Sequence, residues 1–227
     1  MLSEQDRVRI SAAITEVEAK TSGEIFCVLA KDVSRYREVP LLWAAVAAFI
    51  VPPLLVLLGL HRLALASIFT SWTDESARAM EGLILRALST FELVQAGVFL
   101  GVAILVAMPS VRRVMTPGAL KAYRVRQAAR RHFVAVGARL SKAEPHILIY
   151  ASLNDRRVEL VAHDAIHKAV GEGPWSESVA AVVDGMKTGK QADGFIKAIG
   201  ICGAALAKHF PPTGAPANRL PNRVSKG

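Results

Sequence analysis

Helical, strand-like and uninterrupted apolar patterns follow one another along this chain of 227 residues. The first pattern starts at Ser3, where Asp6 three residues later suits a capping box, and apolar residues such as Ile10 and Ile14 then recur at helical spacing. We expect an amphipathic helix of about 17 residues there. A Thr-Ser-Gly turn follows, and the short apolar run Glu24–Ala30 (EIFCVLA) predicts a buried strand.

Two long apolar runs interrupt this soluble pattern. Residues 40–60 form 21 positions without a charge, and residues 91–108 carry one acid, Glu92, near the start. Because a helix needs about 20 apolar residues to cross the hydrocarbon layer, both runs predict transmembrane helices. The Pro52-Pro53 pair predicts a kink in the first run. Between the runs, residues 74–88 predict an amphipathic helix that lies along the outer interface or packs on the ends of the spans.

The pattern after the second run returns to that of a soluble domain. Residues 109–141 predict one long basic helix or a pair broken at Pro117-Gly118, with an apolar stripe along one side. Residues 146–153 and Arg157–Ala162 then predict two strands, joined by the tight turn Asn154-Asp155-Arg156.

Three helical segments close the pattern, at Asp164–Val170, residues 175–187 and residues 192–208. The Pro-rich tail, residues 212–227, predicts disorder. This order of elements indicates an α/β fold with a transmembrane hairpin inserted after its first strand. We therefore expect one domain formed by residues 1–38 and 110–211, and a hairpin with its outer loop at residues 39–109.

The charge distribution indicates a side of the membrane. Basic residues flank the hairpin at Lys31, Arg35, Arg37, Arg112, Arg113, Lys121, Arg124, Arg126, Arg130 and Arg131, whereas the connecting loop carries only Arg62, Arg78 and Arg86. The positive-inside rule places both termini in the cytoplasm of a bacterial-type inner (plasma) membrane, with spans at about 40–60 and 91–108. The first 20 residues lack the apolar core of a secretory signal.

Composition excludes some partners. The net charge of +9 comes from basic residues beside the hairpin and not from a stripe interleaved with aromatic residues, which argues against nucleic acid and for the lipid bilayer. Cys27 and Cys202 lie in apolar contexts, and in a reducing cytoplasm we expect two buried thiols.

The soluble segments resemble the TPM domain family over residues 3–38 and 110–211. The resemblance rests on the order and spacing of several pieces, which are Thr21-Ser22-Gly23-Glu24-Ile25, the strand HILIYASL, Arg156-Arg157-Val158-Glu159, Trp175 and the closing His209-Phe210-Pro211. It implies a small mixed sheet covered by helices on both faces. Some relatives are tied to photosystem repair and act as acid phosphatases, and some bind calcium, so the resemblance also implies a metal-dependent phosphatase using a divalent cation. This chain itself has no alternating Asp and Asn run of the calcium-binding type.

Few residues suggest chemistry. His163 and His167 echo a zinc signature without a third ligand, and we interpret them as surface residues, so we assign no metal site. No phosphate-binding loop and no nucleophile elbow occurs in the sequence. The candidate ligand or partner-binding residues are Glu24, Arg156, Arg157, Asp164 and Trp175. The two arginines suit a phosphate or an acidic partner, and the alternative is that they are solvated turn residues. For Trp175 the alternative is a packing role in the core.

Two functions are compatible with these residues. The first is a noncatalytic membrane-anchored domain that binds a membrane-protein partner or assists assembly or quality control of a membrane complex. The second is a metal-dependent phosphatase that uses Glu24, Asp164 and Arg157, with catalytic residues otherwise unassigned.

Overall fold

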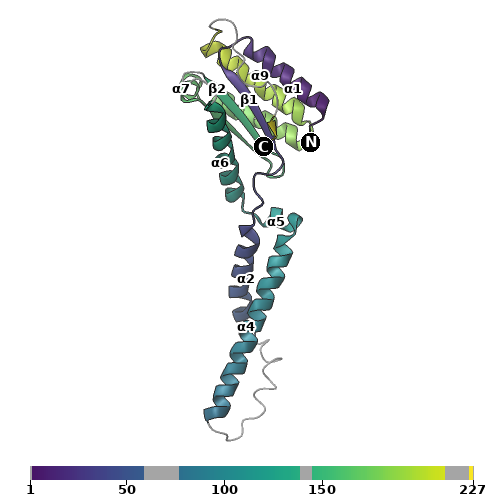
Figure 1. Cartoon of the computed structure of the whole chain (residues 1–227), viewed down its shortest axis with the longest axis vertical. Coiled ribbons are helices and arrows are strands. Elements are labelled where there is room, and N and C mark those ends of the chain that lie inside the picture. Colours follow the sequence, from purple (N-terminus) through teal and green to yellow (C-terminus); the bar gives the residue numbers. More distant parts are fainter. Residues whose placement is uncertain (1, 59–76, 139–144, 213–224, 227) are drawn as a thin grey trace. The chain divides into compact units, whose positions relative to one another are not determined.

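The computed structural model describes residues 2–58, 77–138, 145–212 and 225–226, with the backbone alone for residues 77–87 and 225–226. The chain divides into two compact units. Met1–Arg35 and Gly118–Gly227 form the first, which we call the sheet unit, and Tyr36–Pro117 form the second, which we call the hairpin unit (Figure 1).

A small mixed sheet organises the sheet unit. Its strands are β1 (Glu24–Ala30), β2 (His146–Ser152), β3 (Arg157–Ala162) and the two-residue β4 (Ser225–Lys226), in the order β3-β2-β1-β4. β1 runs parallel to β2, whereas β2 and β3 form the predicted antiparallel hairpin. The α/β fold with a small mixed sheet is therefore confirmed.

The two faces of the sheet pack against different helices (Figure 1). Odd-numbered residues of β1 and β2, such as Ile25 and Ile147, contact α1 (Glu4–Glu18), α8 (Gly173–Lys187) and α9 (Gln191–His209). Even-numbered residues of the same strands contact α6 instead, and these include Phe26, Val28, Leu148 and Tyr150. Side chains alternate between the two faces of a strand. The uninterrupted apolar sequences of β1 and β2 therefore supply side chains to the hydrophobic cores on both faces of the sheet.

Helix α6 (Gly118–Gly137) covers the second face with Val125, Ala128 and Ala129, which are buried. It follows the short α5 (Pro109–Met115), and Thr116 adopts an extended conformation between them. The predicted basic segment is thus a broken pair of helices, because Pro117 disfavours the helical conformation of the residue before it.

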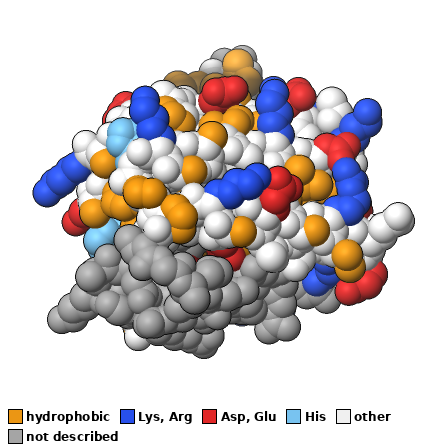
Figure 2. Space-filling view, turned by 90° about the horizontal axis from the view of Figure 1, so that it is seen from above, with side chains coloured by type: hydrophobic (Ala, Val, Ile, Leu, Met, Phe, Trp, Pro, Cys, Tyr) orange, Lys and Arg blue, Asp and Glu red, His pale blue; other side chains and the backbone are white. Residues whose placement is uncertain are grey.

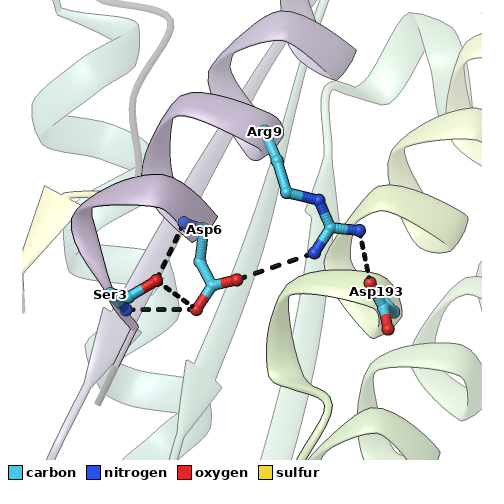
Figure 3. A network of polar contacts seen from close by, with 4 residues as sticks. All are labelled: Ser3, Asp6, Arg9 and Asp193. Atoms are coloured by element: carbon cyan, nitrogen blue, oxygen red, sulfur yellow. Dashed lines mark hydrogen bonds and ion pairs between the residues drawn. The ribbon is translucent and has the colours of Figure 1, made fainter.

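The amino terminus of α1 has the predicted capping box (Figure 3). The Asp6 amide donates to Ser3 Oγ at 3.0 Å, and the Ser3 amide donates to Asp6 Oδ2 at 3.1 Å. These hydrogen bonds, together with Arg9, hold the pKa of the Asp6 carboxyl below its usual value. Arg9 also reaches Asp193 of α9, with its Nη2 2.6 Å from Oδ1, so the same network links the two helices (Figure 3).

Glycines allow α8 and α9 to approach closely. A Cβ added to Gly194 would lie 2.8 Å from the Ala181 carbonyl oxygen and 3.1 Å from the Cα of Gly185. A Cβ added to Gly203 would collide with the side chain of Val17 on α1. The sequence thus places glycines where helix backbones are in contact.

The hairpin unit consists of α2 (Glu38–Leu57), α4 (Ala77–Ala107) and α5. α2 continues through Pro52 and Pro53, and α4 is a single helix of 31 residues. The amphipathic segment predicted as a separate helix is therefore part of α4 from Ala77 onward, because no glycine or proline interrupts residues 77–91 except Gly82, which a helix tolerates. Residues 74–76 of that segment lie outside the described residues.

α2 and α4 pack against each other through small and branched side chains. On α2 the buried residues are Val39 and a series that recurs every four residues, Pro40, Ala44, Ala48 and Pro52. On α4 the less exposed positions recur at helical spacing and are Gln95, Val98, Phe99, Val102, Ala103 and Val106. Small residues at such a contact let two helix backbones approach closely, as in membrane helix pairs.

The carboxyl-terminal tail differs from its prediction at its end. Ser225–Lys226 forms β4 and pairs with Val28 and Leu29 of β1. An edge strand offers unpaired backbone groups to any extended segment that reaches it, and β1 would otherwise be such an edge. The prediction of disorder is therefore wrong for these two residues, and the prediction for residues 213–224 lies outside the described residues.

Candidate functional site

The predicted site residues lie at opposite ends of the sheet. Glu24 opens β1 and is buried, and Asp164 opens α7 (Asp164–Val170) directly after β3. Arg156 and Arg157 lie at the β2–β3 turn, where Arg157 pairs with Ser152, the last residue of β2. Because β2 has seven residues, the two ends are about 20 Å apart. The structure therefore does not bring Glu24, Asp164 and Arg157 into one site.

Four side chains form what we call the amino-end cluster, which consists of Glu24, Phe133, His146 and His163. Glu24 and His146 are register partners on neighbouring parallel strands, which lie about 4.8 Å apart. His146 is buried, stacks on Phe133 of α6 with ring centroids 4.4 Å apart, and lies 5.5 Å from the ring of His163. His146 thus lies at the start of the sheet between Glu24 on β1 and His163 at the end of β3.

Gly137 of α6 and Glu18 of α1 also contact residues at the amino end of the sheet. A Cβ added to Gly137 of α6 would lie 3.1 Å from His146 Nε2, and the Ile25 amide donates to Glu18 Oε1 at 3.1 Å. The absence of a side chain at Gly137 therefore leaves room for the His146 ring, and the Glu18 carboxylate binds the backbone of β1 one residue after Glu24. No local pattern in the sequence marks His146, because only the parallel pairing of β1 and β2 places it beside Glu24.

His163 caps α7 and does not belong to it. Its Nδ1 accepts a hydrogen bond from the Ala165 amide at 3.3 Å, and the helix begins at Asp164, where a carboxylate suits the helix dipole. The His163 side chain is therefore engaged in capping the helix, and His167 is exposed on its last turn. Within the described ranges, no three His, Cys, Asp or Glu side chains come close enough to hold a metal ion.

A second polar group, which we call the carboxyl-end cluster, consists of Asp32, Ser152, Asn154 and Asp155. Asn154 Nδ2 donates to Asp32 Oδ1 at 2.5 Å, and Ser152 Oγ donates to Asp155 Oδ2 at 2.7 Å. Backbone hydrogen bonds from Leu153 and Asn154 to Ala30 and Lys31 continue the parallel pairing into the loops. The cluster therefore ties the β2–β3 turn to the segment that leaves β1.

The candidate arginines project from this end of the sheet. Arg156 has a φ of 51°, a left-handed conformation that suits a tight turn, and both Arg156 and Arg157 are exposed. A Cβ on Gly118, the first residue of α6, would lie 3.5 Å from Arg157 Nη2. Both connections to the hairpin unit, after Arg35 and before Gly118, therefore start at the end of the sheet that carries these arginines.

Trp175 and the two cysteines lie in the core of the sheet unit. Trp175 is buried in the cluster between the sheet, α8 and α9, so its ring does not form an exposed binding face. Cys27 and Cys202 are free and buried, as predicted. Burial raises the pKa of the Cys27 thiol, and it raises that of Cys202 to about 11.

We expect both native thiols to resist alkylation. A thiol reacts as its thiolate, and burial with a raised pKa leaves almost none of that form at neutral pH. Treating the folded chain with a maleimide should leave both cysteines unmodified, whereas two labels should appear in denaturant. Rapid labelling of either cysteine in the folded protein would contradict the burial of these thiols in the core.

His132 of α6 and Tyr150 of β2 are in ring contact. Their ring centroids are 5.4 Å apart. Partial burial, with a smaller contribution from Arg131, lowers the pKa of His132 below its usual value of 6.5, whereas burial and Asp155 raise the pKa of Tyr150. His132 is therefore more easily protonated in the unfolded chain than in the folded one.

This difference predicts a pH dependence of stability. Because the unfolded state binds the proton more readily, protonation favours unfolding, so the part of the stability due to His132 is present above pH 6.5 and lost as the pH falls below it. Thermal unfolding of the full chain in detergent should lose less stability between pH 7.5 and pH 5.5 in His132→Gln than in the wild type. His209→Gln, an exposed control on α9, should follow the wild-type curve, and identical curves for all three proteins would contradict the prediction.

Comparisons with known proteins address the fold. No protein-family model and no curated protein matches the chain. Among solved structures, the chain is similar to the BA42 protein of the psychrophilic bacterium Bizionia argentinensis, determined by NMR, with a TM-score of 0.54 and 19% sequence identity. The match covers 100% of this chain and 96% of BA42. At this identity the similarity concerns the fold alone.

Proposed function

We propose that the protein is a membrane-anchored binding protein, in which α2 and α4 form a transmembrane hairpin and the sheet unit is a TPM-like domain in the cytoplasm. The observation that carries this proposal is the apolar outer surface of the hairpin unit. Large apolar side chains point away from the contact between the two helices, among them Leu41, Leu42, Phe49, Ile50, Leu54, Leu93, Leu100, Ile104 and Leu105.

The two helices have the dimensions that a bilayer requires. Glu38–Leu57 and Leu88–Ala107 are each 20 residues long, with mean hydropathies of 2.3 and 2.0. Only 28% and 6% of these segments is buried, whereas the core helix of a soluble protein would be mostly buried. A contiguous apolar surface of this kind is stable in lipid and promotes aggregation in water. Trp43 near the start of α2 donates from Nε1 to the Met115 carbonyl at 3.0 Å, which ties α2 to α5 beyond the apolar segment.

The sheet unit supports binding at its carboxyl end. Arg156 and Arg157 are exposed there, and the hydrogen bonds of the carboxyl-end cluster fix the turn that presents them. Exposed guanidinium groups on a fixed turn suit an acidic segment of a membrane-protein partner. Such a domain would serve the assembly or quality control of a membrane complex, and both chain connections to the hairpin unit start at that end of the sheet.

A crosslinking experiment tests the binding surface. We expect a photoreactive amino acid at Arg156, in the full chain in native membranes, to form one dominant adduct that Arg157→Glu abolishes by charge reversal. Lys168→Glu, at an exposed position on α7, is the matched control and should leave the adduct intact. An adduct that is insensitive to Arg157→Glu, or the absence of any adduct, would contradict binding at this end.

Reporter fusions test the topology separately. The positive-inside rule predicts that a reporter fused after Lys226 is active only as a cytoplasmic reporter, and one inserted near Asp74 only as an external reporter. The reverse pattern would overturn the cytoplasmic placement, and it would do so without affecting the crosslinking result.

A further inference from the structure

The net charge of the protein originates in one segment. Between Glu92 and Glu144 the chain has no Asp or Glu and nine basic residues, which are Arg112, Arg113, Lys121, Arg124, Arg126, Arg130, Arg131, Arg139 and Lys142. The remaining 19 of the 28 basic residues match the 19 acidic residues of the chain. The whole excess of +9 is therefore confined to this segment, and α6 is its largest described element.

The exposed side of α6 combines basic with apolar and aromatic groups. Arg126, Arg130 and Arg131 are exposed, and among them lie Tyr123 and Val134, which are 57% and 68% exposed. We call this surface, together with Gln127, the outer face of α6. Gln127 Nε2 donates to the Tyr123 hydroxyl at 2.6 Å, which holds the tyrosine ring along the helix.

Two features distinguish this face from the rest of the sheet unit. Among the described residues of that unit, Val8 is the only other large apolar side chain in the exposed class. In addition, the face of the molecule drawn in Figure 2 carries Lys and Arg interspersed with Asp and Glu, whereas α6 itself contains no acidic residue. Glu159 of β3 lies beside this face, with its Oε1 3.6 Å from Arg126 Nε.

The geometry points to one partner for this face: we propose that the outer face of α6 docks on the anionic phospholipid headgroups of the bilayer. Arginines suit the phosphates, and a tyrosine and a valine suit the boundary between headgroups and acyl chains. The opposite side of α6 stays packed on the sheet, so docking requires no unfolding.

Chain continuity favours lipid over a soluble acidic partner. Ten residues, 108–117, separate Ala107, the end of α4, from Gly118, the start of α6. Even a fully extended segment of that length reaches only about 40 Å, and α6 itself is about 30 Å long. This inference rests on the proposed transmembrane hairpin, because insertion of α4 would hold α6 within reach of the membrane surface in any arrangement of the two units.

Electron paramagnetic resonance on the full chain in nanodiscs tests the proposal. One nitroxide label is attached at Val134→Cys on the outer face, and in a separate sample another is attached at Phe49→Cys on α2. The native cysteines are buried and should stay unlabelled. Accessibility to a neutral water-soluble nickel relaxer is compared in phosphatidylcholine and in an equal mixture with phosphatidylglycerol.

We expect the nickel accessibility of the label at Val134→Cys to be at least about threefold lower in anionic nanodiscs than in phosphatidylcholine nanodiscs. High salt should restore the accessibility. Each basic residue near an anionic surface strengthens binding by about fivefold, so Arg126→Gln/Arg130→Gln/Arg131→Gln should weaken docking by roughly a hundredfold and abolish the change. Lys187→Gln/Lys190→Gln/Lys197→Gln removes the same charge from exposed positions on and between α8 and α9, and it should leave the change intact.

The outcomes separate this proposal from the one on which it rests. In one outcome the label at Phe49→Cys is shielded from nickel, but the nickel accessibility of the label at Val134→Cys is the same in neutral and anionic nanodiscs. That result would overturn the docking and would still support the transmembrane hairpin. A label at Phe49→Cys that is open to nickel would overturn both. Protection of Val134→Cys by added RNA or polyglutamate, without an effect of lipid charge, would assign the face to a nucleic acid or an acidic protein and would also overturn the proposal.

Discussion

Phe49→Lys/Ile50→Lys is expected to prevent stable membrane insertion of the protein. Both side chains lie near the middle of α2, and Phe49 is 74% exposed, so the lysines would face lipid if the hairpin spans a membrane. A lysine at the centre of a membrane helix costs about 2.5–3.5 kcal/mol, so the pair should cost about 5–7 kcal/mol. The measurement is the fraction of the chain that resists alkaline extraction from membranes.

A matched variant separates this effect from a general effect of added charge. Val8→Lys/Val114→Lys also replaces two exposed apolar residues, but these lie on α1 and α5, outside the two apolar segments. It should leave the extraction-resistant fraction at the wild-type level. Equal behaviour of the two double variants would contradict the placement of α2 in lipid.

Gly194→Ala is expected to destabilise the sheet unit by about 2 kcal/mol. The added methyl group would lie 2.8 Å from the Ala181 carbonyl oxygen, and backbone atoms of two packed helices cannot move aside cheaply. Overpacking of this kind costs about 1–3 kcal/mol, which outweighs the helical preference of alanine over glycine. Thermal or denaturant unfolding of the full chain in detergent measures the change.

Gly200→Ala provides the control in the same helix. A Cβ at that position meets no atom within 4 Å, and the residue is exposed. It should therefore stabilise α9 by up to about 1 kcal/mol through helix propensity alone. If the two alanine variants were equally stable, the close approach of α8 and α9 would be wrong.

Most element boundaries followed from local sequence signals. The capping box at Ser3 and Asp6, the strand Glu24–Ala30, the hairpin around Asn154 and the helix Asp164–Val170 each depend on residues a few positions apart. Capping residues, turn residues and hydrophobic periodicity act over such short distances, so a sequence can reveal them. The break between α5 and α6 at Pro117 belongs to the same class.

The features that could not be predicted from the sequence depend on contacts between residues far apart in the chain. Nothing local indicates that β1 pairs in parallel with β2, 122 positions later in their register. This pairing puts His146 beside Glu24, and the length of β2 puts Arg157 at the far end from both. The phosphatase hypothesis grouped Glu24, Asp164 and Arg157 on the basis of the family resemblance, and not on their positions in the sheet. A sequence pattern does not show which end of a sheet a strand terminus occupies.

The tail and the second apolar helix show the same limit. Residues 212–227 are Pro-rich, yet Ser225–Lys226 pairs with β1, because an unpaired strand edge accepts an extended segment with little regard for its composition. Residues 77–88 have an amphipathic pattern that predicts a separate helix, but without a breaking residue they continue into α4. In both cases tertiary context or helix continuity outweighed the local pattern.

The central claim is that α2 and α4 cross a lipid bilayer, and subcellular fractionation of the unmodified chain tests it most directly. After lysis without detergent and an alkaline carbonate wash, the full-length polypeptide should remain in the membrane pellet and be released only by detergent. Recovery of the intact chain as a monodisperse species in the aqueous supernatant would contradict the claim.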